Sequence, residues 1–459
     1  MAIGTSWISD WNPEDQKFWE SKGKFIARRN LIWSIFAEHL GFSIWLIWSI
    51  VATKLPQAGF HYTTDQLFQL VALPGLIGSL MRFPYTFAVV TFGGRNWTIF
   101  SASVLFIPVL ALSYFVTKPD TPFWLMLLVA ATAGLGGGNF ASSMTNISFF
   151  YPDRMKGWAL GLNAAGGNIG VSSVQLLTPI LLGVGFINLH LGPPSPGGFY
   201  LQNAGLMWLL PLAIAVCGAI FFMNNLATAR STLRDQFAIV RRKHTWIMSY
   251  IYIGTFGSFI GYSAAFPLLI KTQFPEVTIG IAFLGPLVGS LSRPLGGLLA
   301  DKVGGAIVTF WNFIAMGAAT LGVIYFIETK EFAGFLAMFL IVFITTGVGN
   351  GSTYRMIPSI FREEKLREAT AGEMAKSLAL KAASIESGAA LGFIGAIGAC
   401  GGYLIPRGFG ASIVATGGPY LALKIYLAFY ATCLVLTWWY YLRKAPLTSG
   451  ASSLAQARV

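Results

Sequence analysis

Residues 293–305 read RPLGGLLADKVGG, and residues 82–94 read RFPYTFAVVTFGG. In both stretches an arginine within an apolar segment is followed, at the same distance along the chain, by two glycines. A second pair of stretches, GLGGG at 134–138 and GVGNG at 347–351, repeats at nearly the same offset. Two pairs of similar stretches, separated by nearly the same number of residues, predict that the chain is built from two duplicated halves.

The composition around these repeats is that of a membrane protein. Of the 459 residues, 55% are hydrophobic and only 11% are charged, whereas a soluble domain carries about 25% charged residues. The mean hydropathy is +0.64. These values exclude a soluble, a disordered or a nucleic-acid-binding chain, even though the net charge is +13. The 52 glycines and 37 phenylalanines suit closely packed membrane helices.

A membrane-spanning helix needs about 20 apolar residues, and the chain offers twelve such stretches. The sequence therefore predicts an all-α membrane protein with twelve transmembrane helices in two pseudo-symmetric six-helix halves. The expected spans lie near residues 31–53, 66–91, 97–117, 123–150, 157–183, 204–226, 246–270, 278–300, 306–327, 333–361, 385–406 and 419–442.

The basic residues predict the orientation of these spans. Most of the 31 Lys and Arg residues fall in the N-terminal tail, the loops after even-numbered spans and the C-terminal tail. Positive charge marks the cytoplasmic side, so we expect a multi-pass protein of the cytoplasmic (inner) membrane with both termini in the cytoplasm. The expected organisation is a tail (1–30), a six-helix half (31–226), a cytoplasmic linker (227–245), a second half (246–442) and a tail (443–459).

Other chemistry is sparse. Cys217, Cys400 and Cys433 lie in apolar runs without metal-ligand spacing, so we expect neither a disulfide framework nor a metal site. The first 30 residues are polar and basic and show no cleavable signal peptide. The chain has no nucleophile motif and no phosphate-binding loop, and its four histidines are scattered. We therefore expect no enzyme, no cofactor and no nucleic-acid partner.

Two arginines stand inside predicted spans at equivalent places of the repeat, Arg82 and Arg293. An arginine at the middle of a span costs about 2.5–3.5 kcal/mol on insertion scales. Of the 18 acidic residues only Glu38 lies well inside an apolar span, so protein carboxylates cannot neutralise both arginines together with Arg355. We expect the two guanidinium groups to face each other across a central cavity and to bind an anion. Their fork geometry favours a flat oxyanion such as nitrate, nitrite or a carboxylate.

Small residues recur at helical spacing in several spans. Such repeats let helix backbones approach closely, either for ordinary packing or so that helices can slide between conformations. The glycines in question are Gly134, Gly138, Gly166, Gly170, Gly347 and Gly351.

Several motifs together resemble a known family. Residues 136–150 (GGGNFASSMTNISFF) and 347–354 (GVGNGSTY) look like the signatures of the nitrate/nitrite porter family. Residues 161–170 (GLNAAGGNIG) and the opening DWNPEDQKFWE (10–20) are similar to the same family. Residues 296–305 resemble the loop signature of the major facilitator superfamily, to which that family belongs.

The resemblance implies a site as well as a fold. It implies alternating access by two six-helix halves, with one nitrate or nitrite ion held between Arg82 and Arg293. It also implies ring contacts on both faces of the ion, hydrogen bonds to it and one further cavity aromatic. Phe140 and Phe256 match the ring contacts, Tyr252 and Asn168 match the hydrogen bonds, and Phe42 matches the further aromatic residue.

The chain departs from the family pattern at a few positions. Ala164 and Ala165 stand where some relatives carry glycine, and Glu38 and Arg355 stand where some relatives carry uncharged residues. Glu38 and Arg355 can pair with each other or with water. Alternatively Glu38, which burial makes easier to protonate, carries a coupling proton; His39, on another side of the helix, is the weaker candidate.

These features predict a secondary transporter used in nitrate transport and assimilation. We expect nitrate/nitrite exchange, because an empty positive site disfavours reorientation. A proton–nitrate symporter with Glu38 in proton coupling is the alternative, and a passive anion channel is a third reading. The expected partners are nitrate, nitrite and the lipid bilayer, and the expected state is a monomer.

Overall fold

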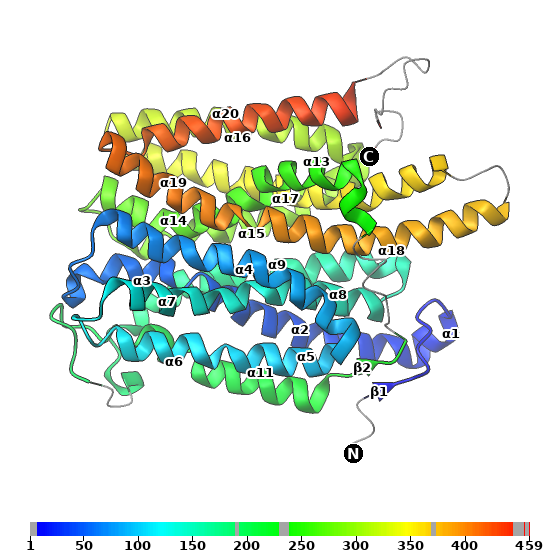
Figure 1. Ribbon diagram of the computed structural model, residues 1–459, viewed down its shortest axis with the longest axis horizontal. Coiled ribbons are helices and arrows are strands. Elements are labelled where there is room, and N and C mark those ends of the chain that lie inside the picture. Colours follow the sequence, from blue (N-terminus) through cyan, green and yellow to red (C-terminus); the bar gives the residue numbers. More distant parts are fainter. Residues whose placement is uncertain (1–6, 189–191, 229–237, 369–372, 444–453, 455–458) are drawn as a thin grey trace. The chain divides into compact units, whose positions relative to one another are not determined.

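The computed structural model describes residues 7–188, 192–228, 238–368, 373–443, 454 and 459. Helices account for most of these residues (Figure 1). The first series consists of α1 (Gln16–Phe18), α2 (Lys24–Trp45), α3 (Trp48–Lys54), α4 (Thr64–Phe92), α5 (Gly94–Val104), α6 (Phe106–Phe115), α7 (Phe123–Ala133), α8 (Asn139–Phe150), α9 (Asp153–Leu181), α10 (Asn203–Leu206) and α11 (Leu209–Phe222).

The second series repeats the pattern of long apolar helices. It consists of α13 (Lys243–Tyr252), α14 (Ser258–Gln273), α15 (Leu284–Val303), α16 (Gly305–Glu328), α17 (Phe332–Glu368), α18 (Glu373–Gly398), α19 (Gly401–Thr416) and α20 (Tyr420–Thr437). Short 3₁₀ or π turns join or extend helices at Trp19–Gly23, Pro56–Ala58, Gly134–Gly138, Gly185–Asn188, Ala238–Arg241, Ile253–Gly257, Ile279–Ile281 and Trp438–Leu442.

The membrane-spanning helices follow the predicted pattern. Within the described residues, 11 helical stretches are long and apolar enough to cross a membrane. The other long helix, α9, has 29 residues, which corresponds to about 44 Å at 1.5 Å per residue. Its glycines and asparagines lower its hydropathy, and with α9 the predicted twelve spans are all present as helices. The all-α membrane fold is confirmed.

The echoed glycine pairs end one long helix and begin the next. Gly93 has φ +88° between α4 and α5, and Gly304 has φ +99° between α15 and α16. Residues with a side chain rarely adopt this backbone conformation. The sequence echo thus marks two equivalent helix-to-helix turns.

The chain forms two compact units, which are described separately. Unit 1 comprises Met1–Arg230, Ser263–Leu287 and Gly402–Gly410, and unit 2 comprises Ser231–Tyr262, Val288–Gly401 and Ala411–Val459. The five-part organisation expected from the sequence stays a prediction.

In unit 1, α4 packs against α7, α8 and the Gly134–Gly138 turn (Figure 1). A Cβ atom on Gly137 would lie 2.6 Å from the Cα atom of Gly78, so the two backbones are in direct contact. α2 packs against α8 and α9. The arginine-bearing helix α4 is therefore held by a glycine-lined partner.

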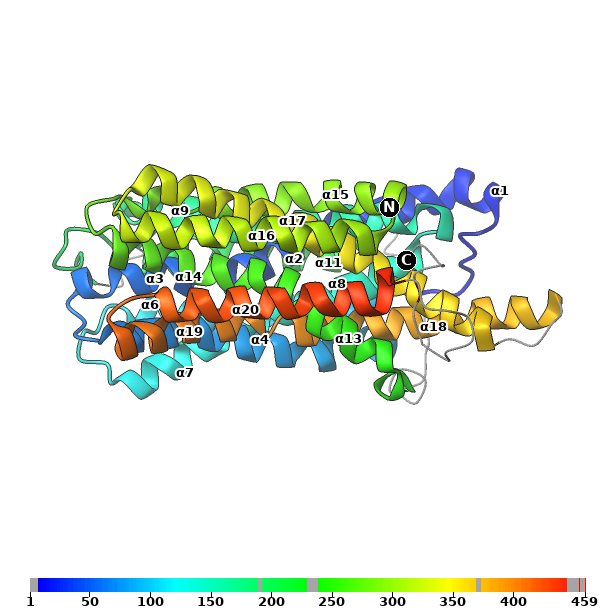
Figure 2. The same ribbon diagram turned by 90° about the horizontal axis from the view of Figure 1, so that it is seen from above.

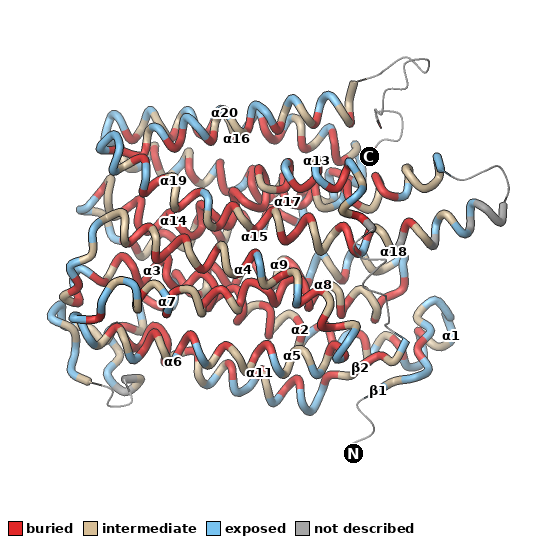
Figure 3. Tube along the Cα trace, viewed as in Figure 1, coloured by how far each residue is buried: buried red, intermediate tan, exposed pale blue. Residues whose placement is uncertain are grey.

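Unit 2 repeats this arrangement with other residues. α16 packs against α17 and α20 (Figure 2). A Cβ atom on Gly351 of α17 would lie 2.7 Å from the backbone nitrogen of Gly297 on α15, and it would also meet the carbonyl oxygen of Arg293. Helix α14 is divided between the two units. Both of its parts are buried along almost their whole length (Figure 3).

The N-terminal segment is more structured than its polar composition predicts. Trp11 and Trp19 lie in a buried cluster with Phe150 and Tyr151, and burial raises the pKa of Tyr151 to about 12. Strand β1 (Trp7–Ile8) pairs in parallel with β2 (Asn225–Leu226), a local exception to the all-helical pattern. Tryptophans spaced along the polar segment anchor it to unit 1.

Candidate functional site

Arg82 occupies the interior of unit 1. Its helix, α4, begins with a capping box in which Thr63 and Gln66 bond each other's backbone. The side chain of Arg82 is 0% exposed. Its Nε donates a hydrogen bond to the carbonyl oxygen of Gly137 at 3.1 Å. This bond fixes one edge of the guanidinium group on the glycine-rich turn.

Aromatic rings surround this guanidinium group. Its Cζ lies 4.6 Å from the centroid of the Phe140 ring and 5.4 Å from that of Trp45. Phe42 meets Phe140 edge to face at 6.0 Å and meets Trp45 at 5.5 Å. A cation over ring faces is attracted by the ring quadrupole. The structure thus brings together Arg82, Phe42 and Phe140, and adds Trp45, which the sequence reasoning missed.

Asn168 lies on α9, which packs against α2. Ser43 of α2 donates to the carbonyl oxygen of Gly170 at 2.8 Å. The side chain of Asn168 is 0% exposed, and within the described part of the chain neither atom of its amide has a hydrogen-bond partner. A buried amide without partners is costly, so this side chain is suited to receive a polar ligand.

Arg293 occupies the corresponding place in unit 2, on α15, and is 5% exposed. Its Cζ lies 5.3 Å from the ring centroid of Tyr354. Tyr354 lies 6.0 Å from Tyr252, which stacks on Phe256 at 5.3 Å. The hydroxyl group of Tyr252 donates to Oδ1 of Asn350 at 2.8 Å. Tyr354 thus links Arg293 to the stacked rings of Tyr252 and Phe256.

The sequence contained signals for the missed residues. Tyr354 and Asn350 lie inside the stretch 347–354 that resembles a family signature. Trp45 follows Phe42 by one helical turn on α2, so the two share a helix face. The two groups lie in separate units, and their roles as ligands of one ion stay a prediction.

Glu38 is buried in a polar cluster of unit 1. It is 0% exposed, and its carboxylate accepts hydrogen bonds from Nδ2 of Asn163 at 2.7 Å and from the hydroxyl group of Ser143. Ser143 also bonds Ser34 at 3.0 Å. The cluster joins α2, α8 and α9. Arg355, the other departure from the family pattern, forms its ion pair with Asp301 in unit 2.

The predicted packing glycines all lie where a side chain would collide with a neighbour. A Cβ atom on Gly138, for example, would lie 2.7 Å from the ring of Tyr85. The atoms that the other five would meet belong to Ile77 for Gly134, Ile35 for Gly166, His39 for Gly170, Gly289 and Ser292 for Gly347, and Arg293 for Gly351.

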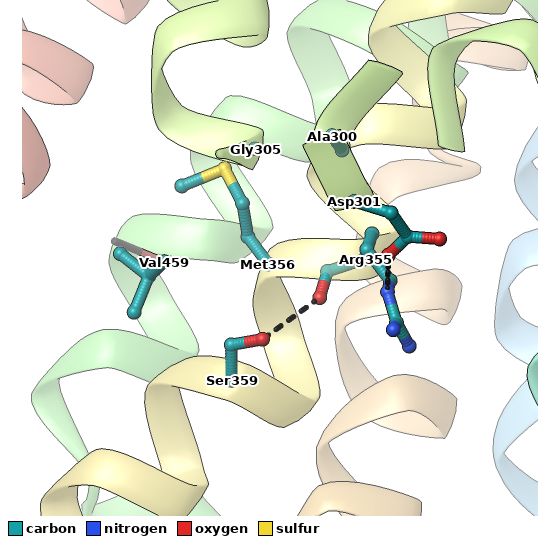
Figure 4. A pocket seen from close by; sticks show the side chains of 7 residues that line it. All are labelled: Ala300, Asp301, Gly305, Arg355, Met356, Ser359 and Val459. Carbon is teal, nitrogen blue, oxygen red and sulfur yellow. Dashed lines mark hydrogen bonds and ion pairs between the residues drawn. The ribbon is translucent and has the colours of Figure 1, made fainter. Parts of the chain in front are cut away.

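Unit 2 also contains paired charged groups near the ends of its helices. A cavity of about 180 Å³ lies beside the Asp301–Arg355 pair, as Figure 4 shows, and Met356 and Ser359 also line it. Arg242 bonds Glu368 and Glu386. The hydrogen bond that Arg242 donates to the Glu368 carboxylate is the main cause that raises the pKa of Arg242 above its ordinary value.

Known proteins resemble this chain over nearly its whole length. A protein of Salmonella typhimurium named "Nitrate/nitrite transporter NarU" is 45% identical over 96% of this chain and 97% of its own. A Thermus thermophilus protein named "Probable nitrate/nitrite antiporter NarK2" is 38% identical over 96% and 98%. The inward-open xylose transporter XylE from E. coli shares the fold, with a TM-score of 0.64, 14% identity and coverage of 94% and 99%.

The fold and the two buried arginine–aromatic groups define a multi-pass membrane transporter made of two related helical halves. A family model described as the Major Facilitator Superfamily matches residues 31–372. The chain belongs to this superfamily and, within it, to the nitrate/nitrite porter family.

Proposed function

We propose that this protein carries nitrate and nitrite across the cytoplasmic membrane by alternating access. The names of relatives at 45% and 38% identity support these substrates. The observation that carries the proposal is the burial of one arginine in each unit, at equivalent places of the sequence repeat and against aromatic rings. Burying a cation in an apolar interior is costly, and an anionic substrate lowers that cost.

In the proposed site a single anion lies between Arg82 and Arg293. Phe140 and Phe256 provide ring faces for it, and Phe42 closes the apolar wall. Asn168 donates a hydrogen bond to its oxygens, and its amide, which lacks a partner among the described residues, supports this role. Tyr252 donates to the anion by turning its hydroxyl hydrogen from Oδ1 of Asn350 to the ion. Nitrate is flat and weakly hydrated, so a few donors and ring faces can replace its water.

We propose nitrate/nitrite exchange as the coupling mode. The anion neutralises the paired guanidinium groups, so the loaded protein can reorient. Without the anion, the positive charge of the site in a region of low dielectric constant disfavours reorientation, so the return of the empty protein requires a counter-anion. The printed name of the Thermus thermophilus relative, an antiporter, supports this mode.

Proton–nitrate symport with Glu38 as the proton carrier is the second candidate. It is favoured by one observation, the complete burial of this carboxyl group within a cluster of hydroxyl and amide groups. Burial makes protonation of a carboxylate easier. A passive channel has no comparable support, because a channel needs no alternating access.

The remaining architectural expectations belong to the same proposal. The moving bodies are the six-helix halves 31–226 and 246–442, both termini are cytoplasmic, and the protein works as a monomer. The close glycine contacts let the helices that carry the arginines slide against their neighbours.

Counterflow in proteoliposomes tests the function. Vesicles loaded with nitrite should take up labelled nitrate, and empty vesicles should take up little, with or without a pH gradient. Uptake into empty vesicles that follows an imposed pH gradient would favour symport. Uptake that needs neither an internal anion nor a pH gradient would favour a channel.

A further inference from the structure

Trp45 has surroundings that single it out among the buried aromatic residues of unit 1. It is the last residue of α2 and is 1% exposed. Its indole Nε1 donates a hydrogen bond to the carbonyl oxygen of Pro74 on α4 at 2.7 Å. A buried tryptophan usually needs a partner for this N–H, and here the bond fixes the orientation of the ring.

Two glycines make room for the indole ring. A Cβ atom on Gly78 of α4 would lie 2.6 Å from Cε2 of Trp45, and a Cβ atom on Gly137 would lie 2.8 Å from the same atom. Neither distance is compatible with a side chain at these positions. The ring therefore fills a slot between α4, which carries Arg82, and the Gly134–Gly138 turn.

The slot is also the place where Arg82 is held. The carbonyl oxygen of Gly137 accepts the Nε hydrogen bond of Arg82 at 3.1 Å, so one glycine both admits the indole and anchors the guanidinium group. The Cζ of Arg82 lies 5.4 Å from the indole ring. Tryptophan gives the strongest cation–π attraction of the aromatic residues.

We propose that Trp45 is a positioning residue for anion binding. It holds the Arg82 guanidinium group in a fixed orientation for the anion, and it acts through Arg82 rather than by touching the anion. This inference rests on the proposed function of the same site. It assigns the aromatic support of Arg82 to two rings, Phe140 and Trp45.

The test compares KM and Vmax of nitrate/nitrite counterflow for purified, reconstituted Trp45→Leu and Trp45→Phe. Leucine removes the ring and the N–H donor, and KM for nitrate should rise about tenfold, within the range of a desolvated cation–π contact. Phenylalanine keeps a ring face, and KM should rise about threefold. The matched control is Trp48→Leu, because Trp48 is also 1% exposed and has no assigned role in the site.

A merely structural role predicts a different result. Lost packing lowers the melting temperature and the amount of active protein, hence Vmax, and leaves KM unchanged. KM within twofold of wild type in Trp45→Leu, or an equal rise in Trp48→Leu, would overturn the proposal. If Trp45→Leu does not fold, an unchanged KM in Trp45→Phe overturns it. Absence of counterflow by the wild-type protein would instead refute the proposed function.

Discussion

At the scale of single residues, the shape of the cation matters as much as its charge. Arg82 donates a hydrogen bond from Nε to the carbonyl oxygen of Gly137, and its guanidinium group carries two further nitrogens. A lysine has one nitrogen, which can bond either Gly137 or an anion in a given geometry.

We therefore predict that Arg82→Lys raises KM for nitrate about 10- to 100-fold, the loss expected for one charged hydrogen bond of about 1.5–3 kcal/mol. Arg293→Lys should behave alike, because Arg293 occupies the equivalent place in the repeat. Counterflow kinetics of both variants check this prediction. Near-normal KM in either variant would contradict the two-arginine site.

Glu38 allows a second prediction at this scale. Glutamine keeps an oxygen that can accept the hydrogen bonds from Ser143 and Asn163, but it cannot carry a proton. If the protein is an exchanger, Glu38→Gln should exchange nitrate for nitrite with KM and Vmax within about twofold of wild type.

Glu38→Ala provides the contrast. It leaves two buried donors without their acceptor, which costs about 1–3 kcal/mol, and it should lower the melting temperature in detergent. Loss of pH-driven uptake in a stable Glu38→Gln protein would support symport and contradict pure exchange.

At the scale of elements, glycines set the distance between the arginine-bearing helices and their partners. Gly347 of α17 lies against the backbone of Gly289 on α15, whereas a Cβ atom on Gly297 of α15 would meet nothing within 4 Å. Replacing each of these two glycines with alanine therefore separates the effect of helix–helix contact from the effect of intrinsic helix propensity.

Gly347→Ala should destabilise the protein by about 1–3 kcal/mol through overpacking and should reduce transport. Gly297→Ala should be neutral or stabilising by up to about 1 kcal/mol, because alanine is the better helix former. Melting temperatures and counterflow rates measured side by side check both expectations. Equal effects of the two substitutions would show that contact between α15 and α17 is not the cause.

Much of the element pattern could be predicted from the sequence, because it depends on local hydropathy and on turns. The echoed glycine pairs correspond to equivalent turns with positive φ at Gly93 and Gly304. The contacts of Trp45 could not be predicted in this way. They depend on Gly78 and Gly137, which only tertiary packing brings to α2. The ordered N-terminal segment was missed for a similar reason, since Trp11 and Trp19 pack on residues far along the chain.

At the scale of the whole molecule, the sequence repeat and the compact units divide the chain differently. The repeat predicts a boundary in the linker 227–245, while unit 1 also includes Ser263–Leu287 and Gly402–Gly410. Within unit 1, Arg407 pairs with Asp65 at 2.7 Å, and Gln175 donates to the carbonyl oxygen of Ser263 at 2.7 Å. Segments of the second half thus have specific contacts with helices of the first.

The charge of the proposed site makes a final prediction about the transport cycle. If the empty site cannot reorient, nitrate uptake should rise with internal nitrite and saturate, and it should be nearly absent when the vesicles contain only a large impermeant anion. A pH gradient imposed with internal nitrite present should change the rate by less than about twofold, because no proton moves in an exchange of two monovalent anions. Internal nitrate should replace internal nitrite, since both anions neutralise the same pair of guanidinium groups. Uptake that continues at full rate without an internal substrate would mean that the empty site reorients. The protein itself would then have to stabilise the two guanidinium groups when no anion is bound.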